Sequence, residues 1–193
     1  LNELKETVLD KNFDVGLAFD GDGDRVGVVS SSGKFIPIDY YMIIIIRDII
    51  NKVSNKTFLY DVKCSKSLED EINKLGGTPY CYRTGNSYTK AKVKELDLAF
   101  GGELSGHVYF RDKFLGFDSG IYAGLRLLEI LSNTNKSVDE LLDGINRYYS
   151  TPETKYKTRD EIKFDVVKKI EDYCKERGYT YNNIDGVRVT FDD

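Results

Sequence analysis

Three aspartates stand at alternate positions in the stretch FDGDGDRVG, residues 19–27. Single glycines separate Asp20, Asp22 and Asp24, and Arg25 follows at once. Alternate residues of an extended chain share one face, so the carboxylates would converge. Two carboxylates about 4 Å apart repel by roughly 4 kcal/mol at an effective dielectric near 20, and a bound cation would relieve this repulsion. Because hard oxygen ligands suit magnesium, manganese or calcium, the stretch predicts a metal site.

An EF-hand calcium loop also begins with alternating aspartates, but this stretch departs from it twice. The EF-hand needs glycine at its sixth position and glutamate at its twelfth, where this chain has Arg25 and Ser31. Three protein ligands would instead leave an octahedral magnesium ion open to phosphate or water, and Arg25 could bind the same phosphate. The alternative is a solvated hairpin rich in aspartate and glycine.

A second group of polar residues lies in GGELSGH, residues 101–107. Glu103, Ser105 and His107 alternate, so in an extended loop they would face one way. A carboxylate, a hydroxyl and an imidazole side by side suit the hydroxyls of a sugar ring. The alternative is that Ser105 belongs to a turn and that His107, the only histidine of the chain, is structural.

The aspartates and the polar residues of 101–107 can act on one ligand only if the strands that precede them end close together. Apolar runs predict strands at residues 15–19, 25–30, 35–36, 58–62, 78–82, 98–100, 108–110 and 186–191. Helices are predicted at residues 1–11, 40–53, 67–75, 87–95, 120–131, 138–148 and 160–177, with Asp39 as the cap of the second. Alternation of strands and helices between residues 58 and 100 implies a parallel sheet with helices on both faces, whose ligands bind beyond the carboxyl ends of the strands.

Composition narrows the class of protein. The chain has 193 residues, 40% of them hydrophobic, and a formal net charge of −4, which predicts a soluble globular protein with no nucleic-acid surface. The cysteines, Cys64, Cys81 and Cys174, form no CxxC pair, which favours a reducing compartment, the cytoplasm. The most apolar segment, residues 40–50, is too short to span a membrane. Since the chain starts at Leu1 and stops after a strand-like run, we expect it to be a piece of a longer protein.

The motifs together resemble the α-D-phosphohexomutase superfamily, specifically its bacterial phosphomannomutase/phosphoglucomutase branch. The resemblance is carried by DGDGDR and GELSGH with DVK between them. Further matching segments are residues 60–64, 83–87, 114–120 and 184–189. The resemblance covers nearly the whole chain.

The resemblance implies an α/β fold and a four-domain parent protein. Residues 1–34 would end domain 2 and carry the metal loop. Residues 35–146 would form domain 3, the sugar-binding domain, with a mixed, mostly parallel sheet sandwiched by helices. Residues 147–193 would begin domain 4, an α+β domain.

The resemblance also assigns roles to the candidate residues. The magnesium ligands would be Asp20, Asp22 and Asp24. The substrate-binding residues would be Arg25, Lys63, Glu103, Ser105 and His107. Members of the phosphomannomutase type commonly have Thr-Gly-His-Ser where this chain has asparagine at position 86. An asparagine cannot become cationic, so its contact with phosphate should be weaker and less dependent on pH.

The implied reaction interconverts hexose 6-phosphate and hexose 1-phosphate, of mannose or glucose, through a phosphoserine and a bisphosphorylated sugar. Neither the serine loop nor the phosphate-binding loop of domain 4 occurs in this chain, so the fragment alone is expected to be inactive. One alternative is phosphoglucosamine mutase, which typically has glutamine where this chain has Leu104. Another is a non-catalytic module that binds magnesium or a sugar phosphate. A phosphatase with Asp20 as nucleophile is disfavoured, because such enzymes usually have Thr or Val where Asp24 and Arg25 stand.

Overall fold

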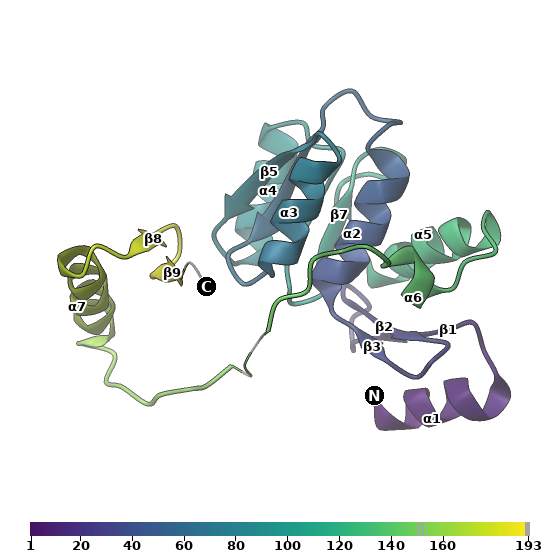
Figure 1. Ribbon diagram of the computed structural model, residues 1–193, viewed down its shortest axis with the longest axis horizontal. Coiled ribbons are helices and arrows are strands. Elements are labelled where there is room, and N and C mark those ends of the chain that lie inside the picture. The colour runs from purple at the N-terminus through teal and green to yellow at the C-terminus, as the bar shows by residue number, and fades with distance from the viewer. Residues whose placement is uncertain (150, 152, 192–193) are drawn as a thin grey trace. The chain divides into compact units, whose positions relative to one another are not determined.

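The computed structural model describes residues 1–149, 151 and 153–191 and divides into two units, Leu1–Tyr148 and Tyr149–Asp193 (Figure 1). No helix among these described residues is both long enough and apolar enough to cross a membrane.

The first unit opens with helix α1 (Asn2–Lys11), which packs on a small antiparallel sheet. Its strands β1 (Val15–Phe19), β2 (Val26–Ser30) and β3 (Phe35–Ile36) lie in the order β1-β2-β3. The close approach of α1 requires glycine at position 16, because a Cβ there would lie 2.7 Å from the Val8 side chain. Strand β2 pairs antiparallel with β1, so the return strand predicted after the aspartates is confirmed.

The larger sheet has the order β5-β4-β6-β7. Its strands are β4 (Thr57–Asp61), β5 (Thr78–Tyr82), β6 (Phe100–Gly102) and β7 (Val108–Phe110). Strand β4 runs parallel to β5 and β6, and β7 runs antiparallel to β6. The expected mixed, mostly parallel sheet is confirmed.

Helices cover both faces of this sheet, as alternation along β4 requires. Phe58 and Tyr60 belong to one buried cluster with residues of α2 (Ile38–Ile49), α3 (Lys66–Lys74) and α5 (Gly120–Ser132). Leu59 belongs to a separate buried cluster with Val93 of α4 (Asn86–Glu95). The isoleucine-rich helix α2 lies inside the unit, since each residue from 41 to 46 is at most 2% exposed.

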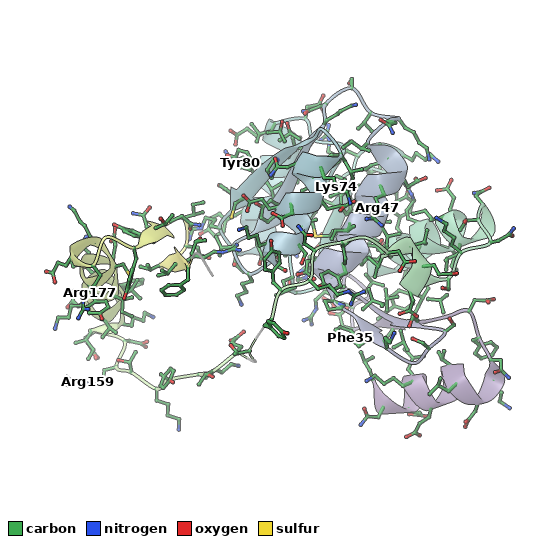
Figure 2. All side chains as sticks on the ribbon, in the orientation of Figure 1. Phe35, Arg47, Lys74, Tyr80, Arg159 and Arg177 are labelled. Atoms are coloured by element: carbon green, nitrogen blue, oxygen red, sulfur yellow. The ribbon has the colours of Figure 1, made fainter. Side chains whose placement is uncertain are left out.

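Two helix predictions are wrong. Asp39 does not cap α2: the helix begins after Pro37, and the carboxylate of Asp39 accepts the backbone N–H of Ser65 at 2.9 Å. The helix predicted over residues 138–148 is only the short α6 (Val138–Leu141). A right-handed helix cannot continue through Gly144, whose φ is 73°. Just before this glycine, Arg47 of α2 donates to the backbone carbonyl of Leu141, at 2.5 Å from Nη1, and to that of Asp143, at 3.2 Å from Nη2 (Arg47 is labelled in Figure 2).

The second unit contains helix α7 (Lys163–Glu176), followed by the antiparallel strands β8 (Thr180–Asn182) and β9 (Arg188–Thr190). The helix predicted over residues 160–177 is confirmed, and Gly178, with a φ of 67°, follows its end. Strand β8 was not predicted, because its three residues are too few to show an alternating pattern.

Candidate functional site

The aspartate loop joins β1 to β2. Its backbone turns rather than running extended: Gly23 has a φ of 75°, and its N–H donates to the carbonyl of Asp20 at 3.2 Å. One carboxylate oxygen each from Asp20, Asp22 and Asp24 lies within 4.8 Å of the others. The predicted convergence of the three carboxylates is therefore present, but its cause is a turn at Gly23 and not an extended backbone.

Arg25 holds the carboxylate of Asp20 in place by two hydrogen bonds. Its backbone N–H donates to Oδ1 of Asp20 at 3.1 Å, and its Nε donates to Oδ2 at 2.5 Å. Desolvation opposes ionisation of Asp20, but these hydrogen bonds and the positive charge of Arg25 outweigh it and lower the pKa of Asp20 to about 2. Asp20 is therefore ionised at neutral pH, and the Arg25 side chain remains 49% exposed.

The second loop joins β6 to β7 and also turns tightly, with the N–H of Gly106 donating to the carbonyl of Glu103 at 3.1 Å. Ser105 therefore does lie in a turn, yet the three side chains still meet. The Ser105 hydroxyl oxygen lies 3.3 Å from Oε2 of Glu103 and 3.0 Å from Nδ1 of His107. Ser105 is exposed, whereas Glu103 is only 2% exposed.

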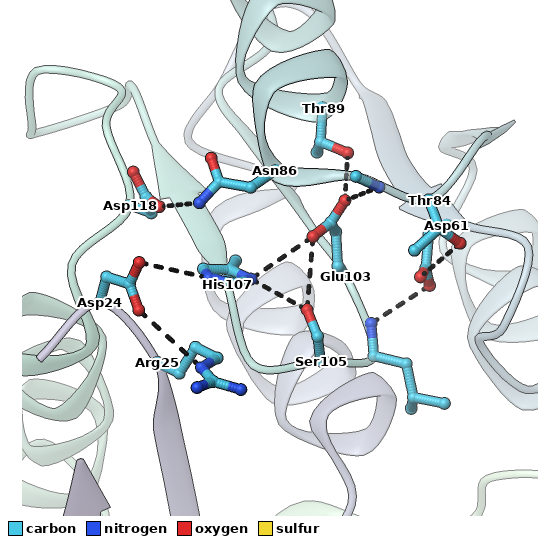
Figure 3. Close-up of polar contacts among 12 residues, drawn as sticks. Asp24, Arg25, Asp61, Thr84, Asn86, Thr89, Glu103, Ser105, His107 and Asp118 are labelled. Carbon is cyan, nitrogen blue, oxygen red and sulfur yellow. Dashed lines mark hydrogen bonds and ion pairs between the residues drawn. The ribbon is translucent and has the colours of Figure 1, made fainter. Parts of the chain in front are cut away.

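Glu103 also links this loop to helix α4. Its Oε1 accepts the backbone N–H of Gly85 and the hydroxyl of Thr89, each at 2.7 Å (Figure 3). These partners hold the buried carboxylate at the start of α4. Only its second oxygen, Oε2, faces Ser105 and His107.

The two loops lie against each other. Arg25 and His107 form an isolated antiparallel bridge, and the N–H of Val26 donates to the carbonyl of Gly106 at 3.4 Å. Nε2 of His107 lies 3.3 Å from Oδ2 of Asp24 (Figure 3). Motifs far apart in the sequence therefore form one polar cluster.

The start of α5 closes the other side of the aspartate loop. The N–H of Gly120 donates to the carbonyl of Gly23 at 2.9 Å, and a Cβ on Gly120 would lie 2.3 Å from the carbonyl oxygen of Arg25. The packing therefore leaves no room for a side chain at position 120.

Two acidic residues of the site were not singled out from the sequence. Asp118 offers a carboxylate oxygen within 4.8 Å of ligand atoms from Asp24 and His107, and it accepts a hydrogen bond from Nδ2 of Asn86 at 2.5 Å. Asp61 is fully buried at the end of β4. Both lie in segments that carry the family resemblance, which was the available signal.

Lys63, the remaining candidate, follows β4 and has an exposed side chain. It therefore lies at the carboxyl edge of the parallel strands, as do the start of α4, at Asn86, and the loop that contains Ser105. This is the edge at which ligands of such sheets bind.

The donor set of the aspartate loop suits magnesium. All three groups are carboxylates, the ligands that a hard divalent cation prefers. Desolvation raises the pKa of Asp24, and the neighbouring charges of Asp22, Asp20 and Asp118 add to this effect, while His107 opposes it. A cation among these oxygens would relieve the crowding of negative charge.

Comparisons of sequence and of structure with known proteins point to the same family. Residues 37–148 match the family model described as phosphoglucomutase/phosphomannomutase, alpha/beta/alpha domain III. A phosphomannomutase/phosphoglucomutase of Pseudomonas syringae is 37% identical over 99% of this chain and 41% of its own length. A phosphoglucomutase/phosphomannomutase family protein from Burkholderia thailandensis has a TM-score of 0.89 and 36% identity, and the match covers this whole chain and 41% of that chain.

A more distant structure shares the fold. It is the N-acetylphosphoglucosamine mutase of Aspergillus fumigatus, in complex with GlcNAc-6P and magnesium. Its TM-score is 0.52 at 16% identity, and the match covers 67% of this chain and 35% of that chain.

Proposed function

Because this chain belongs to the phosphoglucomutase/phosphomannomutase family, we propose that it contributes the metal loop and the sugar-binding domain of a longer phosphohexomutase. The chain spans 41% of the length of the curated relative from Pseudomonas syringae. The proposed reaction of the whole protein moves a phosphoryl group between O6 and O1 of glucose or mannose through a phosphoserine and a bisphosphorylated sugar. The isolated chain is proposed to be inactive.

The proposed domain boundaries follow the resemblance. Residues 1–34 end domain 2, residues 35–146 form domain 3, and residues 147–193 begin domain 4. The match of the family model to residues 37–148 supports the middle assignment. We also propose a cytoplasmic location, which the absence of a CxxC pair among the three cysteines of the sequence supports.

Asp20, Asp22 and Asp24 are proposed to hold Mg²⁺. The ion would neutralise negative charge on a phosphoryl group during its transfer. Arg25 keeps Asp20 ionised, and the exposed part of its guanidinium is proposed to bind a phosphate oxygen. Both proposed roles, metal binding and phosphate binding, belong to the loop between β1 and β2, which lies in the part of the chain assigned to domain 2.

Glu103, Ser105, His107 and Lys63 are proposed to bind the hexose phosphate. The hydroxyl of Ser105 can donate to or accept from a ring hydroxyl, and its exposure supports that contact. Glu103 is proposed to act through Oε2, since Oε1 is already engaged by Gly85 and Thr89. A mutase must accept its intermediate in two orientations, which favours groups that can both donate and accept.

The observation that carries this proposal is the contact between Asp24 and His107, which joins the metal loop to the sugar loop. The test is an assay of the full-length protein with Mg²⁺, a hexose 1,6-bisphosphate activator and three substrates: glucose 1-phosphate, mannose 1-phosphate and glucosamine 1-phosphate. We expect formation of the 6-phosphate from glucose or mannose. Turnover of glucosamine 1-phosphate alone would favour the phosphoglucosamine alternative, and no turnover of any substrate would contradict the proposal.

A further inference from the structure

The buried carboxylate of Asp61 receives hydrogen bonds from three directions. Asp61 is the last residue of β4 and is 0% exposed. Its Oδ1 accepts the backbone N–H of Leu104 at 3.1 Å and the thiol of Cys64 at 3.2 Å. Its Oδ2 accepts the hydroxyl of Thr84 at 3.3 Å (Figure 3).

These donors belong to three different loops of one sheet edge. Cys64 follows β4, Thr84 follows β5 and Leu104 follows β6. Because β4 is parallel to both neighbours, all three loops lie at the carboxyl ends of the strands. The same loops carry the proposed sugar-binding residues, since Lys63 precedes Cys64 and Ser105 follows Leu104.

The hydrogen bonds that Asp61 accepts favour one fixed arrangement of the three loops. Burial and the charge of Asp61 raise the pKa of Cys64 well above its usual value, so this thiol keeps its proton and can donate. A buried carboxylate that loses a donor is left unsatisfied in a low dielectric, which is costly. Any displacement of one loop is therefore resisted by the group that also holds the other two.

We propose that Asp61 is a positioning residue that holds the loops after β4, β5 and β6 in the mutual register needed to retain the sugar ring. The inference rests on the proposed function, because retention matters most while the bisphosphorylated intermediate reorients between its two half-reactions. Because its side chain is fully buried, Asp61 acts on the site through other residues. Its effect passes through the loops that bear Lys63 and Ser105 and through the loop after β5, which leads into α4 at Asn86.

The test compares Asp61→Ala, Asp61→Asn and Ile72→Ala in the full-length protein. Asparagine can still accept the Leu104 N–H, and its amide can donate to the Thr84 hydroxyl. Ile72 is buried on α3 outside the three loops, so its truncation lowers stability without removing a loop contact. The measurements are hydrogen exchange in peptides covering residues 83–86 and 103–107, the KM for glucose 1-phosphate, and the concentration of glucose 1,6-bisphosphate needed for half-maximal activity.

We expect Asp61→Ala to exchange faster in both peptides and to raise the bisphosphate requirement by roughly 10- to 100-fold, because small displacements of a site cost this much. Asp61→Asn should restore most of both properties. Ile72→Ala should melt at a lower temperature with exchange and bisphosphate requirement like the parent. Parent-like behaviour of Asp61→Ala, or the same changes in Ile72→Ala, would overturn the positioning role.

The proposal stays testable if the Asp61→Ala variant does not fold or if the parent protein is inactive. If Asp61→Ala does not fold, Thr84→Val removes one donor only, and unchanged exchange of residues 83–86 in that variant would overturn the proposal. If the full-length parent has no mutase activity, the proposed function fails, while hydrogen exchange still decides whether Asp61 holds the loops.

Discussion

His107 and Asp24 lie side by side, with Nε2 of the imidazole 3.3 Å from Oδ2 of the carboxylate. His107 belongs to the loop between β6 and β7, whereas Asp24 belongs to the loop between β1 and β2. A backbone bridge between Arg25 and His107 supports the contact. This relationship places a carboxylate cluster of the small sheet at the carboxyl edge of the large sheet, where one ligand can meet both.

The aspartate loop should bind magnesium through Asp22. In the full-length protein, magnesium at 100 times its Kd should stabilise the folded state by about 2.7 kcal/mol. Asp22→Asn removes one of three anionic ligands, so this stabilisation and the mutase activity should both fall sharply. Thermal unfolding with increasing MgCl₂ measures the first effect. Asp10→Asn, an exposed charge on α1, is the matched control, and an equal loss in that variant would refute a specific site.

Gly120 should not tolerate a side chain. A Cβ at this position would overlap the backbone of Arg25 at 2.3 Å, so Gly120→Ala must displace the aspartate loop or the start of α5. We expect a loss of about 1–3 kcal/mol in the free energy of unfolding together with weaker magnesium binding. Gly27→Ala is the control, because its nearest neighbour lies at an ordinary 3.7 Å. Denaturant unfolding compares the two, and equal effects would contradict the steric account.

The acid titration of Asp20 should depend on Arg25. Because the pKa of Asp20 is lowered to about 2 in the folded state, its ionisation contributes stability above the unfolded pKa near 3.9. That contribution is lost as the pH falls from about 4 towards 2. Carboxyl NMR in metal-free buffer should show a midpoint near 2 in the parent and a clearly higher one in Arg25→Gln. An unchanged midpoint would show that Arg25 does not set this pKa.

Arg47 should stabilise the first unit through a buried partner. Its Nε donates to Oε1 of Glu71 at 2.8 Å, and the Glu71 side chain is only 5% exposed. Arg47→Met would leave that carboxylate without its guanidinium partner, at a cost of about 3–5 kcal/mol. The double variant Arg47→Met/Glu71→Gln should recover part of the loss, because it removes the buried charge. Urea unfolding tests both, and additive losses would contradict the pairing.

Apolar runs predicted most of the strands, and the alternation of strands with helices predicted the parallel pairing in the large sheet, although not its strand order. Successive side chains of a strand point to opposite faces, with a period of two. The same periodicity drew attention to Asp20, Asp22 and Asp24, although turns at Gly23 and Gly106 bring the polar groups together. Such turns depend on a positive φ at one glycine, and a glycine in the sequence does not reveal its φ.

The tertiary partners of polar residues could not be predicted from local patterns. Asp39 looked like a helix cap, but it binds the N–H of Ser65, which is distant in sequence. The predicted helix after Val138 ends early because Gly144 has a positive φ, and Arg47, distant in sequence, donates to the carbonyl groups of Leu141 and Asp143. The partners of Asp61 and Asp118 could not be predicted for the same reason. The residues that contact them lie in other loops, which come close only when the chain folds.

The most direct test of the central claim, that the aspartate loop binds a divalent cation beside the sugar loop, uses the sole histidine of the 193-residue chain as a reporter. Mn²⁺ can replace Mg²⁺ among carboxylate ligands, and its unpaired electrons broaden NMR signals of nearby protons. We predict that Mn²⁺ broadens the His107 imidazole signals in the parent and that Asp22→Asn abolishes the broadening. Sharp His107 signals in the parent, or equal broadening in Asp22→Asn, would contradict the account.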